Sequence, residues 1–328
     1  MEMRPCWVEI RTRLLEENYG FLQSLAAPHA ELLAIVKADA YGHGLALCAP
    51  AAVRAGAKWL GVTSVEEGVA VRALCPQAHI LVIGGPFPGQ GIEVVRHHLT
   101  SVVWDPAQLD ELEQAARVAG VRPGSVPVHL EIDTGMSRQG VDVEGLELAL
   151  YRFRPASPLR LEGVMTHLFA ADEADGVVTQ SQLTRLDQAL SRISAAALLP
   201  EWLNVGNSAA LVSGQAANLA DLASRHGMRA MLRPGLALYG LVPGFDPDFD
   251  AVPAPVASAR AHLQPVLTWK TRIVSLRSVP AGAVVGYNGT FVATEPMRLA
   301  LVALGYGDGL DRRLGNRFSL LVRGERAP

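Results

Sequence analysis

One lysine of this chain stands out as a residue that could do covalent chemistry. Only three lysines occur among the 29 basic residues, and Lys37 ends the apolar run ELLAIVK. A lysine amine that is removed from water loses basicity and can form a Schiff base with a carbonyl compound. A lysine at a strand end is ordinarily solvated. Its rarity here, and the polar turn ADAYGHG that follows, favour the reactive interpretation.

Two further segments combine polar side chains with backbone N–H groups that could hold an anion. GNSAALVSG places Ser208 where a helix would start, and RPGLALYG places Arg233 at a strand end before Gly235 and Leu236. The N–H groups of Ser208, Gly235 and Leu236, with the Ser208 hydroxyl, could bind a phosphate. Asn-Ser before a helix is by itself only an N-cap signal. Together with a reactive lysine, these segments point to pyridoxal phosphate.

Such residues, far apart in the sequence, need a scaffold that brings strand ends together. Eight short runs rich in Val, Ile and Leu are predicted as strands buried on both faces: residues 32–37, 59–63, 80–84, 101–104, 126–132, 161–167, 202–205 and 229–233. Amphipathic stretches separate them, such as residues 106–119, which follow an Asp N-cap and begin with proline. Eight βα units over about 240 residues predict an α/β fold, a (β/α)8 TIM-type barrel with its chemistry at the carboxyl ends of the strands.

The texture of the sequence changes after Gly240. Residues 241–260 are rich in Pro, Gly and Asp and read as a linker or exposed loop. From residue 263 onward the pattern is short strands and turns, and the alternation in LTWKTRIVSLRSV predicts an antiparallel strand. We therefore expect a barrel domain at 11–240 that binds pyridoxal phosphate. A smaller, mostly antiparallel β domain is expected from 1–10 plus 241–328, with WVEI joining its sheet.

Composition argues against several classes of protein. A net charge of −3 without a basic cluster disfavours nucleic-acid binding. No apolar run reaches the roughly 18 residues of a membrane helix, and no signal peptide is apparent, so a cytoplasmic protein is expected. The three cysteines are widely spaced and indicate neither a disulfide framework nor a metal site. The loop GGPFPGQG departs from the dinucleotide-binding pattern, which leaves a Rossmann domain without support.

The chain resembles the alanine racemases, which are fold-type III pyridoxal-phosphate enzymes. The resemblance covers essentially the whole chain, in the family's order, through AIVKADAYGHG, HLEIDTGMSRQG, EGVMTHLFAAD, NVGNSAA, LRPGLALYG, PVLTWKTRIVSLRSVPAGAVVGYNGTF and LGYGDGLDRRLGNR. It implies an isomerase that interconverts L- and D-alanine and supplies D-alanine for peptidoglycan. Whether the substrate is alanine or serine cannot be read from the residues, because a small pocket does not strongly reject an added hydroxyl.

The resemblance also implies catalytic roles. Lys37 would carry the cofactor and act as the base on the D-amino-acid face, while Tyr287 would act on the opposite face. Racemisation removes a Cα proton on one face and returns it on the other, so two such bases are needed. Tyr287 would reach in from the other subunit of a homodimer and be oriented by His167. Arg138 would orient the substrate carboxylate.

The cofactor contacts implied by the resemblance cover the pyridine nitrogen, the phenolic oxygen and the phosphate. Arg233 would face the ring nitrogen; because it is always charged, it would donate a hydrogen bond without protonating that nitrogen. A weaker electron sink results, which disfavours transamination. The full set of expected cofactor residues is Lys37, Tyr41, Arg138, His167, Asn204, Ser208, Arg233, Gly235 and Leu236.

Three departures from the family pattern stand out. Glu131 occupies the place of a lysine that is commonly carbamylated, and we hypothesise that its carboxylate does the same work. Asn204 replaces a common histidine. Residues 319–323 resemble one arm of a hairpin at an unpaired edge, so we expect an incomplete β domain. The alternatives to an active racemase are a non-catalytic pyridoxal-phosphate carrier, which would lack the β domain, an inactive truncated remnant, and the less favoured Schiff-base aldolase.

Overall fold

The computed structural model describes residues 4–173, 176–245 and 253–328. The chain forms two compact units: a barrel unit, Arg11–Val266, and a β unit that joins the residues up to Ile10 with Leu267–Pro328. The barrel unit thus extends past residue 240, where the composition changes. The reason is helix α11 (Ala254–His262), in which Val256 and Ala259 are fully buried and His262 stacks on Phe21 of the barrel unit.

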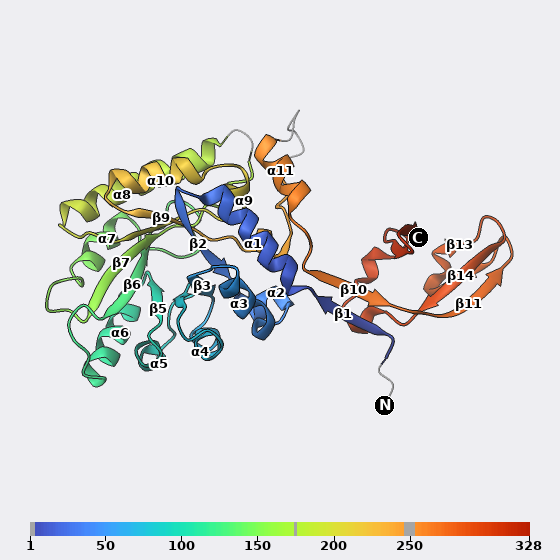
Figure 1. Ribbon diagram of the computed structural model, residues 1–328, viewed down its shortest axis with the longest axis horizontal. Coiled ribbons are helices and arrows are strands. Elements are labelled where there is room, and N and C mark those ends of the chain that lie inside the picture. The colour runs from blue at the N-terminus through green and yellow to red at the C-terminus, as the bar shows by residue number, and fades with distance from the viewer. Residues whose placement is uncertain (1–3, 174–175, 246–252) are drawn as a thin grey trace. The chain divides into compact units, whose positions relative to one another are not determined.

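The barrel unit is a closed barrel of eight parallel strands. Figure 1 shows these strands surrounded by helices. Each of the eight predicted strands is present, which confirms the predicted fold class. The strands are β2 (Ala30–Ile35), β3 (Trp59–Val62), β4 (His79–Val82), β5 (Thr100–Val103), β6 (Val126–Glu131), β7 (Leu159–Met165), β8 (Trp202–Asn204) and β9 (Arg229–Leu232).

Helices follow the strands and begin at residues that satisfy their free N–H groups. Asp105 and Gln108 form a capping box at the start of α6, where the sequence predicts it, and Ser64 caps α4. The helices of the unit are α1 (Thr12–Ala26), α2 (Lys37–Gly42), α3 (Leu45–Arg54), α4 (Val65–Leu74), α5 (Gly91–Arg96), α6 (Pro106–Val118), α7 (Val143–Leu150), α8 (Val177–Ala195), α9 (Ser208–Val212), α10 (Ala216–Arg225), the 3₁₀ turn η1 (Leu236–Tyr239) and α11. Among the described helices, none is both long and apolar enough to cross a bilayer.

Large apolar side chains from the strands fill the interior of the barrel. A cluster of eight buried residues from seven strands forms it: Leu33, Ile35, Trp59, Leu81, Val102, Met165, Trp202 and Met231. Gly61 makes room within this layer, since a Cβ there would lie 2.3 Å from Leu33 Cδ2 and 2.6 Å from Ile35 Cδ1. The carboxyl ends of the strands are therefore held on a close-packed base.

The β unit consists of antiparallel pairs. Its strands are β1 (Cys6–Ile10), β10 (Leu267–Thr271), β11 (Ile273–Val279), β12 (Val284–Val285), β13 (Phe291–Val292), β14 (Met297–Val302), β15 (Leu320–Val322) and β16 (Glu325–Ala327). β1 pairs with β10, which confirms that WVEI joins this domain (Figure 1). The stretch LTWKTRIVSLRSV is not one strand, because β10 and β11 pair with different partners.

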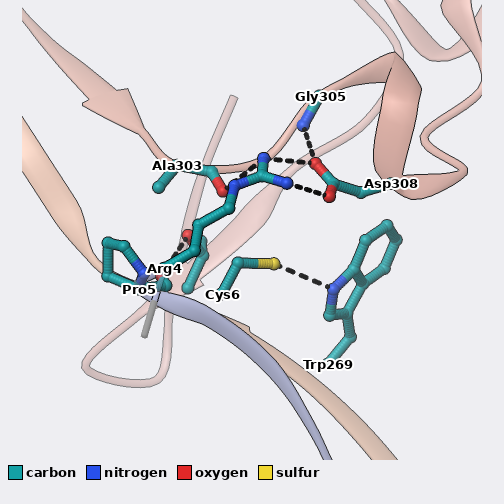
Figure 2. Close-up of polar contacts among 8 residues, drawn as sticks. Arg4, Pro5, Cys6, Trp269, Ala303, Gly305 and Asp308 are labelled. Atoms are coloured by element: carbon teal, nitrogen blue, oxygen red, sulfur yellow. Dashed lines mark hydrogen bonds and ion pairs between the residues drawn. The ribbon is translucent and has the colours of Figure 1, made fainter. Parts of the chain in front are cut away.

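The segment before β1 is attached to the β unit by polar contacts (Figure 2). The Arg4 guanidinium forms a two-point ion pair with Asp308 and donates to the Ala303 carbonyl at 3.1 Å. Asp308 also accepts the Gly305 N–H at 2.8 Å, and the Trp269 indole N–H points to the Cys6 Sγ at 3.3 Å. Residues about three hundred positions apart in the sequence are thereby joined.

Glycine at position 61 is expected to be required by the barrel core. Gly61→Ala should lower the free energy of unfolding by about 1–3 kcal/mol, because the added methyl overpacks Leu33 and Ile35. Gly20→Ala is the matched control: it lies in α1 with open space around it, so it should raise the stability by about 0.5–1 kcal/mol. Urea denaturation followed by circular dichroism measures both. Equal effects of the two substitutions would contradict the packing account.

Candidate active site

A cavity of about 360 Å³ opens at the carboxyl ends of the barrel strands. Its walls come from the segments after β2, β4, β6, β7, β8 and β9, and all of its lining residues belong to the barrel unit. Eight of the residues singled out in the sequence line it: Lys37, Tyr41, Arg138, His167, Ser208, Arg233, Gly235 and Leu236. A larger cavity of about 550 Å³ lies at the amino ends of the strands and contains none of them.

The backbone directly after Lys37 adopts a left-handed helical turn. Residues 38–41 all have φ between +52° and +56°, which costs roughly 1–2 kcal/mol for each residue with a side chain. Two carboxylates hold this turn. Glu67 accepts the N–H of Ala38 at 2.6 Å and that of Thr63 at 2.7 Å, and Asp39 accepts the Leu45 N–H at 2.6 Å. Sequence reasoning missed Glu67; the capping-box pattern S-x-x-E was its available signal.

The Lys37 ammonium lies among other positive charges. Burial lowers the pKa of Lys37, and Arg138 and Arg233 lower it further, while the nearby Glu67 carboxylate opposes them. The Nζ atom lies 6.0 Å from the centre of the Tyr41 ring. A lysine with a depressed pKa has a larger fraction of free amine at neutral pH, which is the form that attacks carbonyl carbon.

Arg233 is buried and almost fully bonded. Its Nη1 donates to the carbonyl oxygen of Asn204 at 2.7 Å and to the Asn204 Oδ1; its Nη2 donates to the Thr166 carbonyl at 2.9 Å and faces the His167 Nδ1 at 3.1 Å. Burial lowers the pKa of Arg233 to about 10, against the effect of Glu131, so the group stays charged. Within the described residues only its Nε–H lacks an acceptor, so one donor remains for a group in the cavity.

The same contact defines the protonation of His167. Arginine can only donate, so the His167 Nδ1 accepts and the ring is neutral. Burial lowers the pKa of His167 to about 3, and the charges of Arg233, Arg138 and Lys37 contribute. The imidazole can therefore orient a partner through its Nε2–H without adding positive charge.

Glu131 is the buried anion beside these cations. It is 2% exposed and accepts a hydrogen bond from the Gln139 amide. Burial raises the pKa of Glu131 above its ordinary value, and the Gln139 bond and the charges of Arg233 and Arg138 offset only part of this effect. Gln139 had not been singled out; it follows Arg138 directly and had no signal beyond that position.

Ser208 and Gly235 lie next to each other in the wall of the cavity. The Ser208 Oγ accepts the N–H of Gly235 at 2.9 Å and that of Ala237 at 3.2 Å, so the hydroxyl hydrogen is left to donate elsewhere. A Cβ on Gly235 would lie 2.6 Å from the Tyr41 Oη, so only glycine permits this approach. The Gly235 N–H, expected to bind phosphate, thus has the Ser208 Oγ as its partner here.

Two predicted residues do not line the cavity. Asn204 is fully buried beneath it and reaches it only through Arg233. Tyr287 begins the turn η2 (Tyr287–Gly289) of the β unit and is 80% exposed. The structure therefore brings together eight predicted residues of the barrel unit, and Tyr287 belongs to the β unit.

The fold and this cavity define a parallel (β/α)8 barrel with a half-buried lysine of lowered pKa at the carboxyl ends of its strands. Its residues 10–243 match the family model of the alanine racemase N-terminal domain, and residues 266–328 match that of the C-terminal domain. The alanine racemase of Syntrophobacter fumaroxidans is 36% identical over 326 residues, which are 99% of this chain and 80% of that protein. The chain belongs to the alanine racemase family, a family of isomerases.

Solved structures agree with this assignment. Alanine racemase from Streptomyces coelicolor A3(2) is similar with a TM-score of 0.86 and 31% identity, over 99% of this chain and 81% of that one. Alanine racemase from Bartonella henselae, solved with covalently bound pyridoxal phosphate, is similar with a TM-score of 0.79 and 25% identity, over 99% and 82% of the two chains.

The expectation of an incomplete β domain is not confirmed. The C-terminal family model matches residues 266–328. The strand expected to lack a partner, β15, pairs with β16 through the turn at Arg323 and Gly324, which the sequence pattern did not reveal as a complete hairpin. The β domain that a non-catalytic carrier would lack is present.

The neutral state of His167 predicts a pH dependence of stability. The folded chain binds this proton only near pH 3, whereas the unfolded chain binds it near pH 6.5. Between these values the unfolded state holds more protons, so stability falls as the pH drops below 6.5. His167→Gln should remove up to about 1.4 kcal/mol per pH unit from this slope. Urea denaturation of cofactor-free protein between pH 6.5 and 4.5 measures it, and identical slopes would contradict the assignment.

Proposed function

We propose that this protein interconverts L- and D-alanine by a two-base mechanism with pyridoxal phosphate as its cofactor. One observation carries the proposal: the Lys37 amine, whose pKa is lowered, lines the same cavity as Arg138 and Arg233. This cavity lies in a barrel that matches the alanine racemase N-terminal domain. The D-alanine product would serve peptidoglycan synthesis, in the cytoplasm.

The residues of the cavity fit pyridoxal phosphate. Lys37 would bind its aldehyde carbon, and the Tyr41 and Ser208 hydroxyls with the Leu236 N–H would hold its phosphate. Three features support this fit. Gly235 has no side chain to keep a ligand away from the backbone. The Ser208 hydroxyl hydrogen and the Arg233 Nε–H are both left to donate to a ligand. The cofactor of the Bartonella henselae relative supports it too. Bound in this way, pyridoxal phosphate supplies an electron sink that makes the Cα–H of an amino acid acidic.

Lys37 would exchange a proton with Cα on the face of the D-amino acid. The lowered pKa of Lys37 supports this role, because it increases the fraction of free amine that can accept a proton. Arg138 would bind the substrate carboxylate and so orient the Cα–H bond. Arg233 would donate its Nε–H to the cofactor's ring nitrogen, and its pKa of about 10 keeps the proton on the arginine.

Tyr287 would serve as the base on the opposite face. Lys37 cannot reach both faces of a planar carbon, so a second base must come from elsewhere. We propose that Tyr287 reaches the cavity of a second copy in a homodimer, where His167 orients its hydroxyl. The exposed apolar side chains of the β unit, among them Trp7, Leu276 and Leu301, support such a partner. Sedimentation velocity at assay concentrations tests this association.

The assignment of Lys37 predicts a specific loss. Lys37→Ala should abolish the visible absorbance that develops when pyridoxal phosphate binds covalently, and should lower L- to D-alanine conversion by at least about a thousandfold. Lys58→Ala, at an exposed lysine paired with Glu31, is the control and should retain both. Absorbance measured after dialysis and a coupled D-alanine assay give the readouts. An unchanged band in Lys37→Ala would refute the assignment.

Glu131 is predicted to balance the arginines of the site. Glu131→Gln keeps the shape and an acceptor for Gln139 but removes the charge, so the alanine turnover number should fall by roughly tenfold or more. Glu147→Gln removes an exposed carboxylate and should have no effect. Activity of Glu131→Gln equal to that of the unchanged protein would show that the carboxylate has no such role.

A further inference from the structure

A line of buried polar side chains runs through the barrel interior, from Arg233 in the candidate active site towards the amino ends of the strands. Asn204 accepts from Arg233 through its Oδ1, and its Nδ2 faces the His129 Nδ1 at 3.5 Å. The His129 Nε2 lies 3.7 Å from the Glu162 Oε2. Asn204 and His129 are fully buried, and Glu162, 8% exposed, lines the cavity at the amino ends of the strands. Neither His129 nor Glu162 has a part in the proposed catalysis.

Two local features of β6 and β7 build this line. Val128 lies opposite Leu161 and His129 opposite Gly163, so Glu162 is an extra residue at a bulge. A bulge re-aims a side chain that would otherwise alternate to the other face. Gly163 makes room for the imidazole, since a Cβ there would lie 2.6 Å from the His129 ring.

The carboxylate of Glu162 is fixed from several sides. It accepts from the Thr100 hydroxyl at 3.2 Å and from the Arg160 guanidinium at 2.8 Å. Burial raises the pKa of Glu162, whereas the Arg160 guanidinium and the His129 ring lower it, so the carboxylate is ionised at neutral pH. The line therefore ends in a permanent anion.

The donors and acceptors along this line can be assigned in only one way. Arg233 has no acceptor, so Asn204 must turn its oxygen to Arg233 and its NH2 group to His129. The His129 Nδ1 must then accept, which puts the ring hydrogen on Nε2, facing Glu162. The Asn204 amide would have to give up one partner if the histidine carried its hydrogen on Nδ1.

We propose that His129 and Glu162 are positioning residues for Arg233. They hold the Asn204 amide in one orientation, and the amide holds the guanidinium so that its Nε–H faces the cavity. The catalytic part of this inference rests on the proposed function, in which that N–H contacts the cofactor. The structural part concerns Arg233 alone and is independent of any ligand.

The first test determines, in the unchanged protein, which ring nitrogen of His129 carries the hydrogen. Nitrogen-15 NMR of histidine-labelled, cofactor-free protein reports which ring nitrogen carries the hydrogen, and His129→Gln assigns the signal. The Nε2–H tautomer is expected for His129. The Nδ1–H tautomer, measured in the unchanged protein, would overturn the proposal.

The second test compares three variants in the barrel interior. His129→Phe fills the space but offers Asn204 no acceptor, whereas the Oε1 of His129→Gln can accept. Ser101→Ala removes a fully buried hydroxyl that has no partner within the described residues and lies outside the line. Solvent exchange of the Arg233 Nε–H in cofactor-free protein should accelerate roughly tenfold or more in His129→Phe only.

In the cofactor-loaded enzyme, His129→Phe should lower kcat by a similar factor with little change in KM, and His129→Gln should restore it. A purely structural role would lower the denaturation midpoint and leave Arg233 exchange unchanged, and that result would overturn the proposal. Normal Arg233 exchange in an unchanged protein that fails to racemise alanine would count against the proposed function alone.

Discussion

The site depends on keeping three cations, Lys37, Arg138 and Arg233, together in one cavity. Burial lowers the pKa of Lys37, and repulsion from the two arginines lowers it further. Arg233 tolerates this because four acceptors hold its Nη groups. Glu131 supplies compensating charge close by. A cavity of this kind favours anionic ligands, such as a phosphate and a carboxylate, and it keeps His167 neutral.

The barrel meets this constraint by bringing six chain segments together at the carboxyl ends of its strands. Two carboxylates stabilise the strained left-handed turn after Lys37: Glu67 accepts the N–H of Ala38, and Asp39, within the turn, accepts the N–H of Leu45 at the start of α3. Below these strand ends, the bulge at Glu162 and the absence of a side chain at Gly163 admit polar groups into an otherwise apolar interior. Positions that look dispensable in sequence therefore determine how the charged groups are oriented.

Much of this arrangement could be predicted from the sequence. The eight strands are apolar runs between helical stretches, so their order and the barrel followed from periodicity, and most expected pocket residues sit just after a strand. Gln139 and the line from His129 to Glu162 could not, because their roles depend on contacts between segments that no local pattern encodes. The S-x-x-E pattern marks Glu67 as a capping residue, but not its contact with Ala38. The hairpin of β15 and β16 was missed for a related reason: three-residue strands leave too little alternation to read.

The two bases of the proposed mechanism act on opposite faces of one carbon, and isotope exchange separates them. Tyr287→Phe, loaded with pyridoxal phosphate, is incubated in D2O with D-alanine and, separately, with L-alanine, and proton NMR follows the Cα–H. The account predicts that D-alanine exchanges its Cα hydrogen without forming L-alanine, because Lys37 still acts on that face, while L-alanine exchanges far more slowly. Equal exchange of both enantiomers, or rapid racemisation, would contradict it.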